Sequence, residues 1–252
     1  MSSVPSPNIW HWPEVYEREN RAQDASGAIW AALREVCDWA GADVIDIGCG
    51  DGFHLPMFAS SARAVVGVEP HPPLVRRAMD RVGALANVRV IEAGAERVPL
   101  RDSSADVVHA RTAYFFGPGC EPGLAEADRL LRADGVLAIV DLDASRPPYG
   151  DWMRADLPRY DPPGVERFFE RRGFTLRRVD TEWRFPDRET LEAVLGIEFS
   201  APVARRAIAA TEGLTLPVSY RIHTRRKPAG LLLPGRAARR EPRRAAGQPR
   251  VS

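Results

Sequence analysis

Cysteine and lysine are both scarce in this chain of 252 residues. The three cysteines, Cys37, Cys49 and Cys120, are odd in number, lie far apart and form no C-x-x-C pair. This argues against a disulfide framework and against a structural zinc site. No group of His, Cys, Asp or Glu has the spacing of metal ligands, so we expect no metal.

Long apolar runs are absent as well. No window approaches the ~18 apolar residues of a membrane helix. Residues 1–12 have neither the basic start nor the apolar core of a signal peptide. We therefore expect a soluble, cytoplasmic protein with no membrane partner. A single domain of this length buries roughly 70–75% of its unfolded surface, so it needs no disulfide or metal to stabilise it.

Positive and negative charges are balanced in total but not along the chain. There are 35 basic and 34 acidic residues, and Lys227 is the only lysine. Residues 228–252 hold six arginines and one glutamate, a net charge of +5, which leaves −4 for residues 1–227. The Pro/Arg/Ala/Gly composition of 228–252 predicts a disordered basic tail. Since no aromatic residue lies between its arginines, we do not expect nucleic acid as a partner.

In the first 140 residues, short apolar runs alternate with segments whose apolar residues have helical spacing. Such strands are typical of an α/β fold with an open parallel sheet, covered on both faces and joined by right-handed crossovers. We predict strands at 43–47, 64–68, 88–91, 106–110 and 136–141, and helices at 13–21, 53–62, 72–82 and 121–132, the last closed by Asp134-Gly135. A further helix near residue 29 would be capped by Asp24 or Ser26.

The remainder has a different pattern. Residues 144–163 are rich in proline and aromatic side chains, and a helix that ends at Gly173 follows them. We then predict a strand at 174–185, a helix at 189–209 and a strand at 217–224, with the two strands antiparallel at the sheet edge.

The most informative segment is 44–52, V-I-D-I-G-C-G-D-G. A strand that enters glycines gives a backbone that turns sharply and admits a ligand without Cβ atoms in the way. In doubly wound sheets the ligand lies at the carboxyl ends of the strands. Glu69 ends the second strand, 19 residues after Gly50, where an acid can accept hydrogen bonds from both ribose hydroxyls.

The glycine spacing is G-x-G-x-G, whereas a dinucleotide site has G-x-G-x-x-G. Asp46 and Asp51 place two carboxylates around the loop, and these would repel a pyrophosphate but suit a ligand that carries an ammonium group. The loop therefore favours S-adenosylmethionine over NAD and disfavours an NAD-dependent oxidoreductase.

In these residues the chain resembles the class I S-adenosylmethionine-dependent methyltransferases of the small-molecule type, similar to methyltransferase domains 11 and 25. The resemblance covers about residues 40–143 and continues in the family's order through 66–70 (V-G-V-E-P), 93–100 (A-G-A-E-R-V-P-L), 104–108 (S-A-D-V-V) and 126–137 (E-A-D-R-L-L-R-A-D-G-V-L). It implies a Rossmann-like, seven-stranded and mostly parallel sheet of order 3-2-1-4-5-7-6, with S-adenosylmethionine as cofactor.

The resemblance also assigns the cofactor contacts. It implies methionine-end contacts from the glycine loop, a ribose acid, two residues beside the adenine and one residue facing the donor methyl: Asp46, Gly48, Gly50, Glu69, Ala95, Glu96 and Ala110. Cys49 fits as a small residue beside the cofactor. Two positions depart from the family: Gly94 replaces its Asp, and Tyr114–Phe116 replaces its L-H-H, which makes the pocket wall more apolar.

No general base is evident from the sequence. The candidates are Tyr16, His54 and Asp141. Tyr16 belongs to an aromatic segment with Trp10, His11 and Trp12 that forms either a lid or a hydrophobic clasp. The alternative interpretation of His54 is a surface histidine, and that of Asp141 is a solvated loop acid. A second aromatic group either walls the acceptor pocket or only packs on the following helix: Tyr149, Trp152, Met153 and Tyr160.

We therefore predict one methyltransferase domain over 1–227, with a helical lid at 9–40, a cofactor-binding core at 41–143 and a substrate-side region at 144–227. The predicted reaction is in-line methyl transfer to a small-molecule acceptor. The alternative is a cofactor-binding protein without catalysis that acts through partners.

Overall fold

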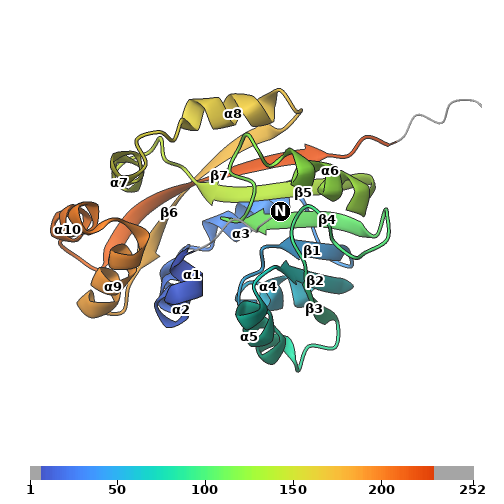
Figure 1. The fold of residues 1–252 in the computed structure, drawn as a ribbon, viewed down its shortest axis with the longest axis horizontal. Helices are drawn as coiled ribbons and strands as arrows, with labels where there is room; N and C mark the ends of the chain where they lie inside the picture. The colour runs from blue at the N-terminus through green and yellow to red at the C-terminus, as the bar shows by residue number, and fades with distance from the viewer. Residues whose placement is uncertain (1–6, 230–252) are drawn as a thin grey trace, which may run out of the picture.

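The computed structural model describes residues 7–229. Its centre is a seven-stranded sheet of order β3-β2-β1-β4-β5-β7-β6 (Figure 1), which confirms the predicted order. Strands β1 to β5 run parallel, whereas β7 is antiparallel to both β5 and β6. The strands are β1 Asp43–Ile47, β2 Ala64–Glu69, β3 Val88–Glu92, β4 Ala105–Arg111, β5 Leu131–Leu142, β6 Thr175–Arg184 and β7 Thr215–Arg226.

Helices cover both faces of the sheet (Figure 1). One face carries α3, α4 and α5, and the other carries α6 and α8, while α1, α2, α7, α9 and α10 gather at one end. The helices are α1 Pro7–His11, α2 Pro13–Ala22, α3 Ala28–Val36, α4 Leu55–Ala59, α5 Pro72–Val82, α6 Glu121–Leu130, α7 Tyr149–Asp156, α8 Pro162–Glu170, α9 Arg188–Glu198 and α10 Ala201–Ala210. No helix within 7–229 is long and apolar enough to cross a membrane.

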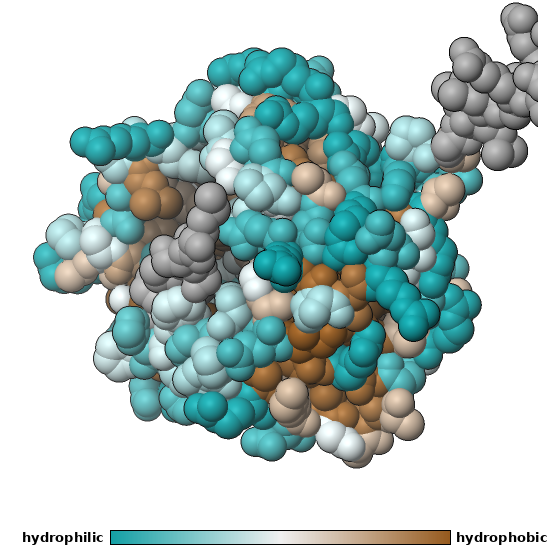
Figure 2. All heavy atoms as spheres, turned by 45° about the vertical axis from the view of Figure 1, so that its right-hand side comes forward, coloured by the Kyte–Doolittle hydropathy of each residue, from teal (hydrophilic) through white to brown (hydrophobic). Residues whose placement is uncertain are grey.

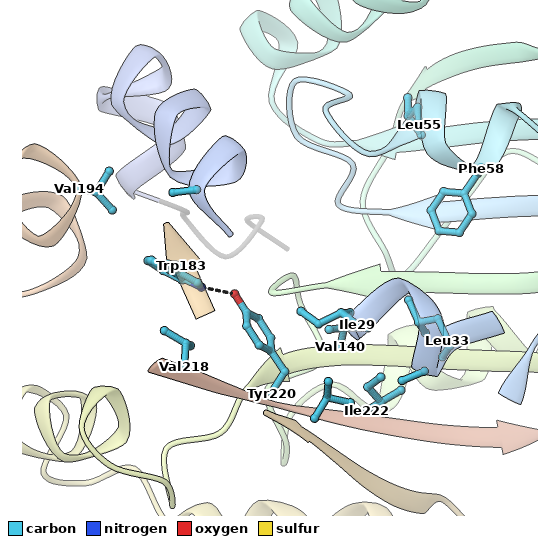
Figure 3. Close-up of a cluster of buried hydrophobic side chains, with 14 of the residues drawn as sticks. Ile29, Leu33, Leu55, Phe58, Val140, Trp183, Val194, Val218, Tyr220 and Ile222 are labelled. Carbon is cyan, nitrogen blue, oxygen red and sulfur yellow. Dashed lines mark hydrogen bonds between the residues drawn. The ribbon is translucent and has the colours of Figure 1, made fainter. Parts of the chain in front are cut away.

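Coverage on both faces explains why the central strands are apolar at successive positions. Almost every residue of β1, β4 and the second half of β5 is buried. Trp183 and Tyr220 form a polar pair within this core: the indole Nε1 of Trp183 donates to the Tyr220 hydroxyl at 3.0 Å (Figure 3). Most of the surface in Figure 2 is hydrophilic, and its largest apolar patch lies in the lower part.

Two predicted helix boundaries are wrong. Helix α6 ends at Leu130, because Leu131 is already extended and pairs with Ala105 of β4. The left-handed residue of the following turn is Asp134, with φ 63°, and not Gly135. The predicted helix 189–209 is two helices. Pro202 has no N–H to donate to the carbonyl of Glu198, and the backbone is extended between α9 and α10.

Smaller differences concern short elements. Helix α4 is shorter than the predicted 53–62, and α1 and α7 were not expected. Of the two candidate caps of α3, Asp24 accepts from the Ile29 amide at 3.1 Å, whereas the Ser26 hydroxyl lies against Thr181. The predicted tail, 228–252, lies outside the described residues except for its first two positions.

Candidate functional site

A cavity of about 440 Å³ lies at the carboxyl ends of β1, β2 and β4. Its walls are the loops that follow these strands, the segment 93–96 after β3, and the helices α1 and α2. This is the position at which open α/β sheets bind their ligands.

The glycine loop after β1 forms one wall. Gly48 and Gly50 have φ values of 73° and 58°, a conformation that favours glycine. The amides of Gly48 and Cys49 donate to the carbonyl of Val68 at 2.7 and 3.1 Å, so the loop is fastened to the end of β2. A Cβ at Gly48 would lie 2.4 Å from the Cβ of Ala113, which shows how closely the loop approaches the segment after β4.

Glu69 ends β2 beside this loop and is 5% exposed. One of its carboxylate oxygens accepts from the Gly50 amide at 3.1 Å, and the other accepts from the His71 amide at 3.0 Å. Burial raises the pKa of the Glu69 carboxyl, while these two amide bonds oppose the shift. The carboxylate is therefore held in one orientation at the cavity wall.

Most predicted site residues line this cavity: Tyr16, Gly48, Cys49, Gly50, His54, Glu69, Ala95 and Glu96. Three do not. Asp46 is buried, with its carboxylate 2.7 Å from Nδ1 of His109. Ala110 is fully buried in the cluster beneath α6. Because side chains alternate along a strand, its neighbour Arg111 faces the opposite side and lines the cavity.

The third, Asp141, is wrong as a solvated loop acid and does not line the cavity. It is 8% exposed and accepts from the buried Arg221 guanidinium at 3.2 Å. The aromatic residues predicted nearby also lie outside the cavity lining. The Tyr149 hydroxyl donates to Glu198, and the Tyr160 hydroxyl accepts from Arg221 at 2.5 Å. Neither prediction describes Tyr149, which lies against Trp183 and Phe199 and not against the helix that follows it.

Sequence reasoning missed several lining residues, chiefly Asn8, Ile9, Asn20, Phe53, Arg111, Thr112 and Leu157. Arg111 left one local signal, because it is an arginine that directly follows the predicted strand 106–110. The others reach the cavity through contacts between distant segments, which no local pattern indicates.

Helices α1 and α2 contact residues of α5 and of the loop after β2 beside the cavity. Trp10 stacks on the His71 ring with centroids 4.4 Å apart. Arg81 of α5 donates to the Asp51 carboxylate at 2.9 Å and also contacts Glu17 of α2. The lid predicted from the aromatic N-terminal segment thus corresponds to a wall that touches both the glycine loop and the residues after β2.

Two carboxyls lie close to this wall, the buried Glu19 and the half-buried Glu198. Burial and their mutual proximity raise the pKa of Glu19, and burial raises that of Glu198, above their ordinary value near 4.5. The folded state then binds more protons than the unfolded state, so stability should fall as the pH rises from about 5 through these raised values. We expect Glu198→Gln to flatten this dependence, measured as the free energy of unfolding in urea at pH 5, 7 and 9. Glu189→Gln, at a side chain 89% exposed, is the control. An unchanged slope in Glu198→Gln would contradict the assignment.

The chain is similar to known proteins in the segment that contains much of the cavity lining. Residues 45–139 match the family model described as a methyltransferase domain. This segment of the chain is similar to methyltransferase domains. The matched segment contains the glycine loop, Glu69 and the segment after β4.

Two curated relatives and one solved structure illustrate the similarity. The malonyl-[acyl-carrier protein] O-methyltransferase of Pectobacterium atrosepticum is 28% identical over 143 residues, 56% of this chain and 54% of that protein. The uncharacterized methyltransferase YcgJ of Bacillus subtilis is 29% identical over 126 residues, 49% of this chain and 50% of that protein. The chain thus spans about half the length of these relatives. The YcgJ crystal structure superimposes with a TM-score of 0.57 at 18% identity, over 79% of this chain and 98% of that one.

The cofactor of such a methyltransferase domain is S-adenosylmethionine, and the cavity fits it. Glu69 presents a fixed carboxylate that can accept hydrogen bonds from hydroxyl groups, beside a glycine loop of positive φ values. At the adenine side, a Cβ at Gly94 would lie 2.8 Å from the Glu96 carboxylate, so the absence of the family's Asp leaves space that Glu96 partly fills.

Proposed function

We propose that this methyltransferase domain, spanning 1–227, transfers the methyl group of S-adenosylmethionine to a small-molecule acceptor. The observation that carries the proposal is one cavity that joins the glycine loop, the ribose acid Glu69 and an apolar wall. When bound, the cofactor supplies a methyl group already activated by the sulfonium charge. The chain then has to hold the acceptor in line and exclude water, effects worth ~7–11 kcal/mol in well-oriented reactions.

The proton-handling groups at the cavity are His54 and Tyr16. Burial lowers the pKa of His54, and the charge of Arg111 acts in the same direction, so the imidazole is neutral at pH 7 and can accept a proton. Burial raises the pKa of Tyr16, which keeps its hydroxyl protonated as a hydrogen-bond donor. We propose His54 as the proton acceptor where the acceptor atom must lose a proton.

The nature of the acceptor is suggested by the cavity rim. Phe116 and Leu157 line the cavity and are 43% and 51% exposed. Exposed apolar side chains at the mouth of a pocket favour an apolar ligand over a strongly solvated one. An acceptor with an apolar body therefore fits this entrance.

Titration calorimetry with S-adenosylhomocysteine, followed by incubation with a deuterium-methyl cofactor and an acceptor panel, tests the proposal. We expect sub-millimolar binding and at least one labelled product detected by mass spectrometry. Absence of binding would overturn the proposal. Binding with no product across a broad panel would favour a cofactor-binding protein that acts through partners.

A further inference from the structure

Arg111 is a buried arginine on the cavity wall with part of its guanidinium unused. It is the last residue of β4, lines the cavity and is 7% exposed. Its Nη2 donates to the side-chain oxygen of Gln23 at 2.7 Å. Its Nη1 is buried and donates to no atom of the described residues. A buried donor without an acceptor is costly, so a native structure normally supplies one.

The positive charge of Arg111 also has no carboxylate partner. Within 7–229, no carboxylate oxygen lies within 4.0 Å of its guanidinium. The other buried or partly buried arginines differ, since Arg81, Arg178 and Arg221 contact carboxylates at 2.9, 3.0 and 3.2 Å. An unpaired buried charge is strongly disfavoured unless something compensates it.

The neighbouring acids do not provide that compensation. Glu19 interacts with the charge of Arg111, but burial raises the pKa of Glu19 and, beside it, of Glu198, which favours their neutral forms. What the fold does provide is orientation. The Arg111 Cζ lies 5.3 Å from the ring centroid of Tyr220 and 6.0 Å from that of Trp30. With Gln23, these rings hold the guanidinium in place at the cavity.

We infer that Arg111 binds a carboxylate that enters this cavity, either that of the cofactor's amino-acid part or one carried by the acceptor. This inference rests on the proposed function. A guanidinium suits this task because its planar N–H groups match the two oxygens of a carboxylate, and Nη1 is the nitrogen left free for such a bond. Together with the apolar rim, an acceptor carboxylate would define an amphiphilic acid as the substrate class.

Binding assays with Arg111→Met, Arg111→Lys and the control Arg63→Met separate the two sources. Arg63 lies at the opposite end of the sheet beside Asp43, so its loss should leave ligand affinity unchanged. Each protein is titrated with S-adenosylhomocysteine and with 5′-methylthioadenosine, which lacks the carboxylate. Each is then saturated with S-adenosylhomocysteine and titrated with phenylacetate and decanoate and with their uncharged amides.

If the carboxylate is the cofactor's, Arg111→Met should weaken S-adenosylhomocysteine binding by about 10- to 100-fold and leave methylthioadenosine binding within about twofold. If it is the acceptor's, both nucleosides should bind normally, and the wild-type preference for the acids over the amides should disappear. Arg111→Lys should retain part of the carboxylate binding in either case, since it keeps the charge but not the planar pair of N–H donors.

A general loss of structure would weaken charged and uncharged ligands alike, so the comparison within each pair distinguishes a binding role from a structural one. The inference would be overturned if wild type and Arg111→Met bound S-adenosylhomocysteine with equal affinity and the wild type showed no preference for the acids over the amides. The proposed function would remain intact. Failure of the wild type to bind either nucleoside would instead overturn the proposed function, and the inference with it.

Discussion

Replacing Glu69 with alanine should lower the affinity for S-adenosylhomocysteine by about two orders of magnitude. The variant loses the carboxylate proposed to accept from the ribose, and hydrogen bonds to a charged group contribute ~1.5–3 kcal/mol each. It also loses the acceptor for the Gly50 and His71 amides, so the glycine loop becomes less ordered. Titration calorimetry measures the change.

Two further variants separate these effects. Glu69→Gln keeps the shape and one acceptor, and we expect an affinity loss of about tenfold. Glu92→Gln is the matched control, because Glu92 pairs in register with Glu69 at the end of β3 but is exposed and does not line the cavity. Unchanged affinity in Glu69→Ala would place the ribose elsewhere and contradict the assignment of this acid.

Replacing Gly48 with alanine should destabilise the fold by about 2–5 kcal/mol. The residue has φ 73°, which costs an L-residue roughly 1–2 kcal/mol. The new Cβ would also lie 2.4 Å from the Cβ of Ala113, and such overpacking costs about 1–3 kcal/mol. The measurement is the free energy of unfolding in urea, and ligand binding should be lost as the loop shifts.

The two contributions can be measured apart. Gly41→Ala is the control for conformation alone, since Gly41 has φ 67° and nothing lies within 4 Å of an added Cβ. The double variant Gly48→Ala with Ala113→Gly removes the steric contact and should recover the stability to about the level of Gly41→Ala. If the double variant is as unstable as Gly48→Ala alone, the contact with Ala113 is not the cause.

The elements that could be predicted are those whose determinants lie close together in the chain. The alternation of short apolar strands and helices led to the parallel part of the sheet, and β1 and α5 have the predicted bounds. The errors occur where a distant partner decides. Leu131 and Arg132 continue a helical pattern, yet pairing of Leu131 with Ala105 makes them strand. The missed break between α9 and α10 is an exception, because Pro202 is a local signal against a continuous helix.

The candidate site divides in the same way. The glycine loop and Glu69 could be located from the sequence because a turn without Cβ atoms and an acid at the end of the next strand are features of single segments. The exclusion of Asp141 from the cavity could not be foreseen, because it follows from Arg221, which pairs with it across β5 and β7.

By itself, the sequence determined the fold class and the positions of the glycine loop and of the acid beside it, since each depends on backbone conformation and on spacing along a few residues. Only the tertiary structure decided that Arg111 faces the cavity without a carboxylate partner, and that α1 and α2 form the cavity wall. The physical reason is that burial and charge pairing depend on which distant segments meet. A local pattern does not show whether a buried charge will have a partner in a distant segment.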